Sequence, residues 1–441
     1  EQPVDVKLRA ALVAALRHRR RSAPRGARAL ARRALAAQRA FTAVGVLVDE
    51  RRADAAPSEP DDAAQTVIAS DASCRARRRC IPCSASIASA GRAAATSAAA
   101  LALSITPLGQ AAETLPDPDG KPADMSKPVQ VYILLGQSNM LGFGRVGGDK
   151  DGTLEHAVKS KKLYPYLIDD AGNWIERKDV RNVRVMGSGL GGSRQFNNEW
   201  MTIKGGRIGP EIGIGHHVGE ATDAPVLILK SCIGNRALGW DLLPPGGEGF
   251  EFTDSKGVTW VHPGYKGTPE RWKKGEEPKK IKWYAGMQYD GDIARAKKVL
   301  SELDKFYPDA KSYEVAGFFW WQGDRDSRSE ALSSRYEKNL VHLIKTLRKD
   351  FNAPNAKFVC ASLGQSKKGA TDGGGKILNA MLAVDSDSGK YPEFKGNVAA
   401  VYTHPLSKGG SSGGHYGGNA ETYMNVGEAM GKAMVELLKA D

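Results

Sequence analysis

The sequence predicts a three-layer α/β/α sandwich, in which helices cover both faces of a central parallel sheet. Unbroken apolar runs rich in Val, Ile and Phe have the composition of strands buried on both faces. Helix-period segments alternate with these runs along the chain, which is typical of one open α/β domain. In such a domain the reactive groups lie at the carboxyl ends of the strands.

The elements follow in order along residues 129–441, the stretch that we expect to form this domain. Helix and strand signals alternate without any internal repeat. The stretch Gly234–Trp283 is too long for a simple connection, and long loops in compact domains are usually functional. The predicted strands are Val129–Leu135, Pro225–Leu229, Val315–Trp320, Lys357–Ala361 and Val398–Tyr402, and the predicted helices are Pro210–Ala221, Gln288–Phe306, Glu330–Phe351, Lys376–Ser386 and Ala420–Ala440.

Charge is distributed unevenly over the 441 residues. The chain carries a formal +13, but residues 1–112 hold 17 Arg and 1 Lys against 9 acidic residues, which leaves +4 for the remainder. A segment with few core-forming residues cannot offset its ordering entropy, so residues 1–112 are interpreted as a disordered Arg/Ala-rich leader. A basic arm for nucleic acid is the alternative. We favour the leader and predict no nucleic-acid partner.

The end of this leader resembles a secretory signal. Arg77, Arg78 and Arg79 precede a short apolar stretch, and the small residues Gly109 and Ala111 precede a cut before Ala112. Residues 77–111 therefore predict export to the periplasm or secretion, with residues 113–128 as a linker. No apolar run is long enough to predict a membrane span.

A serine follows the first predicted strand directly, in the sequence Gly136-Gln137-Ser138-Asn139. A serine between a strand and a helix presents its hydroxyl and its backbone N–H at the edge of the sheet, where a nucleophile is needed. Serine is equally common there as a helix N-cap. These residues alone leave both roles open for Ser138.

Three blocks in order resemble one family. The GQSN turn, the block Gly317–Asp326 (GFFWWQGDRD) and His415-Tyr416 are similar to the motifs of the SGNH-hydrolase superfamily. The resemblance is to its sialate O-acetylesterase domain and to the acetylxylan esterases of carbohydrate esterase family six. It covers roughly Val129 to Leu438 and implies a flavodoxin-like α/β/α fold.

The resemblance implies a serine esterase that removes O-acetyl groups from carbohydrates such as sialate or acetylxylan-like glycans, without metal or cofactor. Ser138 would be the nucleophile and His415 the general base, with His404, which ends the last predicted strand, as its rival. The implied oxyanion donors are the N–H groups of Ser138 and Gly234 and the side-chain amide of Gln322. Alternatively, the side chain of Gln322 makes a structural hydrogen bond that joins two loops.

The acid of the triad departs from the family pattern. Many members carry an Asp three residues before the histidine, where this chain has Ser412. We expect Asp324 to orient His415, with Asp326 as second choice. Glu421 and a Ser–His dyad stay open.

The substrate contacts are predicted less directly. Candidates are Asn139, Asn235, Trp240, Trp321 and Asp326. Tryptophans in a Gly-rich loop suit stacking on sugar rings, although ordinary loop packing explains them equally well. A carbohydrate-binding protein with a degenerate esterase site is the alternative function.

Overall fold

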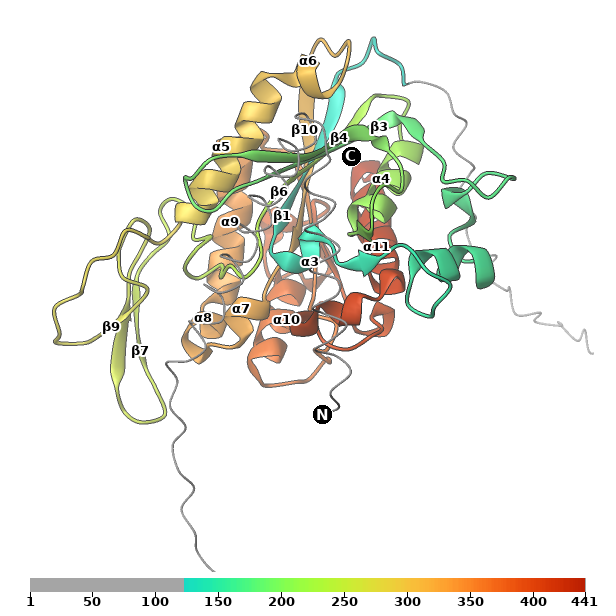
Figure 1. Cartoon of the computed structure of the whole chain (residues 1–441). Coiled ribbons are helices and arrows are strands. Elements are labelled where there is room, and N and C mark those ends of the chain that lie inside the picture. Colours follow the sequence, from blue (N-terminus) through green and yellow to red (C-terminus); the bar gives the residue numbers. More distant parts are fainter. Residues whose placement is uncertain (1–122, 441) are drawn as a thin grey trace, which may run out of the picture. The chain divides into compact units, whose positions relative to one another are not determined.

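A seven-stranded sheet forms the centre of the computed structural model, which describes residues 123–440 (Figure 1). The predicted leader and signal segment, residues 1–112, lie outside the described residues. The spatial order is β12-β11-β10-β1-β6-β3-β4, and all neighbours are parallel except β3 and β4. This confirms the predicted fold class. The strands are β1 (Val129–Gly136), β3 (Arg177–Met186), β4 (Arg194–Met201), β6 (Val226–Ser231), β10 (Tyr313–Trp321), β11 (Lys357–Ala361) and β12 (Val398–Val401).

Helices cover both faces of the sheet, as a three-layer sandwich requires. Alternate residues of β1 enter different cores: Val131 and Ile133 join one apolar cluster, and Tyr132 and Leu134 join the other. The first cluster is completed by α5 (Met287–Ser301), α9 (Tyr336–Asp350) and α10 (Gly373–Val384), and the second by α4 (Glu211–Glu220) and α11 (Ala420–Lys439). In Figure 1 these two groups of helices lie on opposite sides of the sheet.

All five predicted strands and all five predicted helical segments are present, with small differences in their ends. Two predicted helices are each interrupted. One divides at Glu302 into α5 and α6 (Leu303–Phe306), and the other at Arg335 into α8 (Glu330–Ser334) and α9. The Ser329 hydroxyl caps α8 by accepting the N–H of Leu332. The strands β3 and β4 were not predicted, because their charged and polar residues do not form an apolar run.

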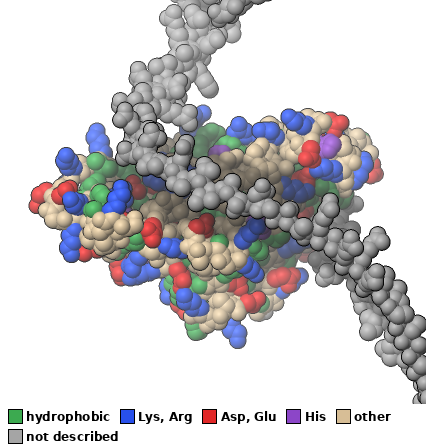
Figure 2. All heavy atoms as spheres, turned by 90° about the horizontal axis from the view of Figure 1, so that it is seen from below, with side chains coloured by type: hydrophobic (Ala, Val, Ile, Leu, Met, Phe, Trp, Pro, Cys, Tyr) green, Lys and Arg blue, Asp and Glu red, His purple; other side chains and the backbone are tan. Residues whose placement is uncertain are grey.

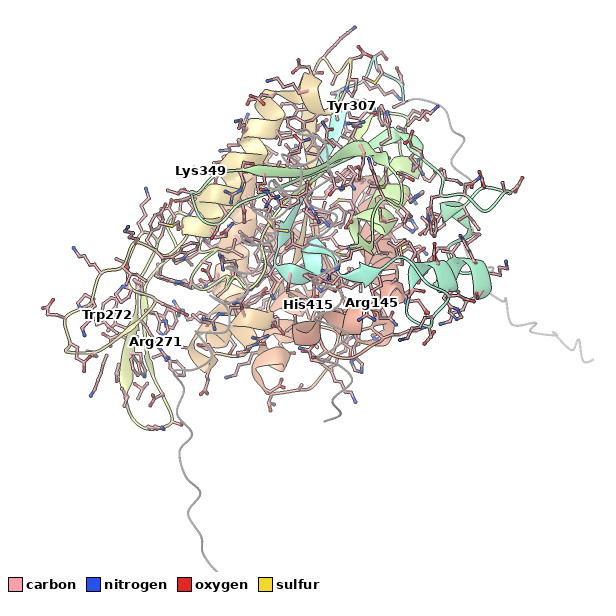
Figure 3. All side chains as sticks on the ribbon, in the orientation of Figure 1. Arg145, Arg271, Trp272, Tyr307, Lys349 and His415 are labelled. Atoms are coloured by element: carbon pink, nitrogen blue, oxygen red, sulfur yellow. The ribbon has the colours of Figure 1, made fainter. Side chains whose placement is uncertain are left out.

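The long connection Gly234–Trp283 contains a separate three-stranded antiparallel sheet. Its strands are β7 (Phe250–Thr253), β8 (Thr259–His262) and β9 (Trp272–Lys273). Figures 1 and 3 show this small sheet at the margin of the fold, away from the central sheet, with Arg271 and Trp272 on it.

Short elements gather at the carboxyl ends of the central strands. Those that build the site are α3 (Ser138–Leu141), α7 (Asp324–Ser327), the 3₁₀ segment η7 (Ser412–Gly418) and the strand pair β2 (Gly144–Arg145) and β5 (Arg207–Ile208). Elsewhere lie η2 (His156–Ser160), η3 (Pro165–Leu167), η4 (Ser386–Ser388), η5 (Pro392–Phe394) and η6 (His404–Leu406). Between residues 123 and 440, no helix has the length and apolar character needed to cross a bilayer.

Candidate active site

Three adjacent strands, β10, β1 and β6, end at the same edge of the sheet. Ser138 follows β1, Gly234 follows β6, and Gln322 follows β10. Because these strands are parallel neighbours, residues far apart in the sequence meet at this edge. Figure 2 views the molecule from this side, where basic and acidic side chains are interspersed around the margin.

Gly136 allows β1 to end directly against β10. Its φ of +142° lies in the region that favours glycine, and a Cβ at this position would lie 2.4 Å from the backbone oxygen of Trp321. The N–H of Gln137 donates to the same oxygen at 3.2 Å. The turn thereby sets Ser138, which is half-buried, as the first residue of α3.

Two backbone N–H groups beside Ser138 have no acceptor. Across residues 123–440, neither the N–H of Ser138 nor that of Gly234 donates a hydrogen bond, and the Ser138 hydroxyl has no partner either. Gly234 is close: a Cβ built on it would lie 3.3 Å from the Cβ of Ser138. A free hydroxyl and two free donors therefore lie together.

His415 is held in an uncommon backbone conformation. Its φ of 53° and ψ of 39° are left-handed, which for a residue other than glycine costs on the order of 1–3 kcal/mol. Its imidazole stacks on Phe143, with ring centroids 4.0 Å apart and planes 9° apart. Figure 3 shows His415 beside α3. The strained turn thus presents the imidazole to the segment that follows Ser138.

The pKa of the His415 imidazole is lowered, chiefly by burial. The carboxylate of Asp324 opposes this shift, and the guanidinium of Arg207 adds to it. The lowered pKa keeps the imidazole neutral at pH 7, the protonation state that a general base needs.

Asp324 connects the end of β10 to the histidine segment. Its Oδ1 accepts a hydrogen bond from the Ser412 hydroxyl at 2.8 Å, and its Oδ2 pairs with Arg328. Ser412, which replaces the aspartate that the family resemblance led us to expect, therefore binds the carboxylate supplied by β10. The carboxylate is also close enough to raise the pKa of His415.

Asn139 and Tyr423 join α3 to the histidine segment. The Asn139 Nδ2 donates to the backbone oxygen of Ser412 at 3.3 Å. The Tyr423 hydroxyl lies 3.2 Å from Asn139 Oδ1 and 3.4 Å from the backbone oxygen of His415. These contacts fix the position of the residue after Ser138 relative to His415.

Gln322 is buried and fully bonded. The Trp320 indole N–H donates to the Tyr336 hydroxyl, which in turn donates to Gln322 Oε1 at 2.8 Å, so the orientation of the amide is fixed. Its Nε2 lies 2.8 Å from the Arg236 backbone oxygen and 2.5 Å from Asp326 Oδ2. This contradicts the expectation of a free amide donor, because an oxyanion would have to displace one of these acceptors.

Comparison with known families is decisive for the chemistry. Residues 260–436 match the family described as "Carbohydrate esterase, sialic acid-specific acetylesterase". This part of the chain is similar to that family. The protein is therefore a carboxylic ester hydrolase. The match includes Gln322, Asp324 and His415, whereas Ser138 and Gly234 lie before it.

Other similarities of the esterase are weaker. It shares 17% identity with a solved protein of Arabidopsis thaliana, over 70% of this chain and 98% of that one, with a TM-score of 0.39. A carbohydrate acetylesterase from Xanthomonas citri shares 14% identity over 69% and 55% of the two chains, also with a TM-score of 0.39. A 93-residue stretch is 27% identical to the Prefoldin subunit beta of Caldivirga maquilingensis, covering 21% of this chain and 77% of that one.

Four residues predicted to contact substrate are buried in the esterase. Trp321 is 0% exposed and donates its indole N–H to Ser362, and Trp240 packs in a small apolar cluster beneath the Gly234–Trp283 connection. Asn139 is bonded as described above. Asp326, also 0% exposed, accepts the N–H groups of residues 238 and 239. Burial contradicts the predicted substrate contacts of these residues, whereas Asn235 is exposed beside Gly234.

Asp326 also does not serve as the acid for His415. Its carboxylate is occupied by three donors from the loop after β6 and from Gln322, and burial raises its pKa to about 6. It anchors the loop that carries Gly234. Glu421, the other alternative, is buried between Lys161 and Lys408.

Three residues at the site were not predicted from the sequence. Phe143 and Tyr423 carry no motif, and Arg207 is far from every predicted strand end. Arg207 lies 4.9 Å over the Phe143 ring. Of these three residues, only Phe143 could have been suggested by the sequence, because it follows Ser138 by five positions.

Proposed function

We propose that the esterase hydrolyses O-acetyl esters on carbohydrates through Ser138, His415 and Asp324. The observation that carries this proposal is the free Ser138 hydroxyl beside two acceptor-free N–H groups, with its helix tied to the histidine segment. An acyl-transfer site needs a nucleophile, donors for the oxyanion and a base close together.

In the first half-reaction, His415 takes the Ser138 proton while the serine oxygen attacks the acetyl carbonyl carbon. The carbonyl electron pair moves to its oxygen, where the N–H groups of Ser138 and Gly234 stabilise the negative charge. The tetrahedral intermediate collapses, the sugar oxygen leaves with the proton from His415, and the acetyl group stays on Ser138. In the second half-reaction, His415 takes a proton from water, which attacks the acetyl-serine. The second tetrahedral intermediate then collapses, His415 returns the proton to the Ser138 oxygen, and acetic acid leaves.

Asp324 acts on His415 by charge, and Gln322 acts as a positioning residue. The carboxylate favours the imidazolium that forms in each half-reaction. Gln322 and Asp326 hold the loop that carries Gly234.

Replacement of Asp324 by asparagine tests this role through the pH profile. The carboxylate raises the pKa of His415, so its removal should move the acidic limb of kcat/KM to lower pH and reduce kcat by about a hundredfold or more. Arg207→Gln should move the limb in the opposite direction, because Arg207 lowers that pKa. A limb that stays in place in both variants would contradict the assignment.

Replacement of Gly234 by alanine should reduce kcat by about tenfold to a hundredfold. The added methyl group would lie 3.3 Å from the Ser138 Cβ, so the donor or the nucleophile must shift. Gly192→Ala is the matched control, since no atom lies within 4 Å of a Cβ there. Steady-state kinetics with p-nitrophenyl acetate measures kcat for both variants. Equal kcat values for Gly234→Ala and Gly192→Ala would show that Gly234 is not near the reacting atoms.

The proposal itself is tested by three measurements on one preparation. We expect p-nitrophenyl acetate turnover and acetate release from an O-acetylated glycan, and labelling by a fluorophosphonate probe at the peptide that contains Ser138. The family description favours sialate over acetylxylan-like glycans. Sugar binding without turnover or labelling would instead support a binding protein with a degenerate site.

We further propose that the esterase acts in the periplasm or outside the cell, on an acetylated glycan. The support is the signal-like sequence at residues 77–111. An N-terminus near Ala112 in the protein isolated from its own cells would agree, and retention of residues 1–111 would contradict it.

A further inference from the structure

A cavity of about 500 Å³ lies at the same edge of the sheet as Ser138. Strands β3 and β4, the start of α4 and residues 202–208 form most of its wall. The remaining wall is Leu141, Gly142 and Phe143, which continue directly from the helix that begins with Ser138. Phe143 also carries the stacked imidazole of His415. The cavity and the candidate active site therefore share a wall.

Two polar side chains of β3 line this cavity without protein acceptors or donors. Strand alternation places Asn182 and Arg184 on the same face. Asn182 is only 6% exposed, and no group in residues 123–440 hydrogen-bonds its amide. Arg184 stacks 4.8 Å over Phe196, and its buried Nε has no acceptor. Buried polar groups of this kind are costly unless a ligand or water satisfies them.

The charges of the cavity wall that are not in ion pairs are positive. Its two carboxylates are each neutralised, since Glu199 lies 3.1 Å from Lys204 and Glu211 lies 2.5 Å from Lys230. Glu199 also accepts the amide of Asn197. Neither Arg184 nor Arg207, the two guanidiniums of the wall, has a carboxylate partner within the described part of the chain.

We propose that this cavity binds the carboxylate of an acidic O-acetylated sugar, with Arg184 and Asn182 as specificity-determining residues. A guanidinium offers a planar pair of donors that matches a carboxylate, and the Asn182 amide supplies a further donor. Arg207 adds positive charge between the carboxylate and the imidazole. The inference rests on the proposed function, because the sugar must present its acetyl ester to Ser138.

The test compares an O-acetylated sialic acid with its C1 carboxamide, which keeps the acetyl ester and removes the charge. The wild-type esterase should prefer the acid by at least about tenfold in kcat/KM, the contribution expected of a charge-assisted bidentate contact. Arg184→Gln should bring this ratio close to one, mainly through KM for the acid, and Arg184→Lys should restore part of it. A purely structural role would lower kcat/KM for both substrates equally and would overturn the proposal.

Arg194→Gln is the matched control, because Arg194 also stacks on Phe196, at 5.1 Å, but does not line the cavity. Its preference for the acid should equal that of the wild type.

A binding measurement separates this inference from the proposed function. In the Ser138→Ala variant, calorimetry with the deacetylated acid and its carboxamide should show at least about tenfold tighter binding of the acid. That difference should be lost when Arg184→Gln is added. Equal binding of acid and carboxamide would overturn the subsite even if esterase activity is normal. A retained difference in binding, together with no turnover by the wild-type esterase, would reject the proposed chemistry alone.

Discussion

Replacement of Ser138 by alanine is expected to reduce kcat for acetyl ester hydrolysis by about ten-thousandfold or more. The variant lacks the oxygen that attacks the carbonyl carbon, while both backbone donors remain. The lost Oγ makes no hydrogen bond in residues 123–440, so the melting temperature should change little. Acetate release under single-turnover conditions measures the first effect and calorimetry the second.

Ser301→Ala is the control for this substitution, since Ser301 is exposed at the end of α5 and its hydroxyl donates only to the backbone oxygen of Lys298. It should retain wild-type turnover and fluorophosphonate labelling. Full activity in Ser138→Ala would reject the nucleophile assignment, and labelling of that variant at another serine would identify the correct residue.

Replacement of His415 by alanine should lower kcat to a similar extent, because no other group would accept the Ser138 proton. The acid limb of the pH profile should also disappear, since it reports titration of this imidazole. Loss of the stack on Phe143 is a second effect, so His415→Gln, which keeps a planar polar group, should be equally inactive and better folded.

His404→Ala distinguishes the two candidate bases. The His404 Nδ1 donates to the backbone oxygen of Gly364 at 2.7 Å, and its ring packs near Tyr402. This variant should keep most of its activity. An inactive His404→Ala together with an active His415→Ala would reverse the assignment.

The central sheet could be predicted because its strands are buried on both faces. A doubly covered strand such as β10 must be almost entirely apolar, and that run is visible without any knowledge of its neighbours. The strand β3 carries five charged residues in ten, including Arg184 and two other arginines, so it shows no apolar run. The cavity that β3 lines forms only when β4, the start of α4 and residues 141–143 pack around it, so it could not be predicted from the sequence.

Motifs at strand ends could predict which residues gather at this edge of the sheet, but not the environments of their side chains. Trp321 and Asp326 belong to the same block as Gln322, yet they point into packed layers. The bond from Ser412 to Asp324 spans 88 residues. Which of the two acids of this block, Asp324 or Asp326, contacts the histidine segment depends on how the end of β10 turns into α7, which composition does not specify.

The bonds from Asn139 to the histidine segment have a consequence for the timing of biosynthesis. They join groups 273 and 284 residues apart, one in the first strand–helix turn and the others near the C-terminal end. A ribosome must therefore synthesise the chain at least as far as Tyr423 before Ser138 and His415 can be held together. Nascent or prematurely terminated chains are expected to be inactive towards esters, so hydrolysis begins only after the final helix has been made and packed.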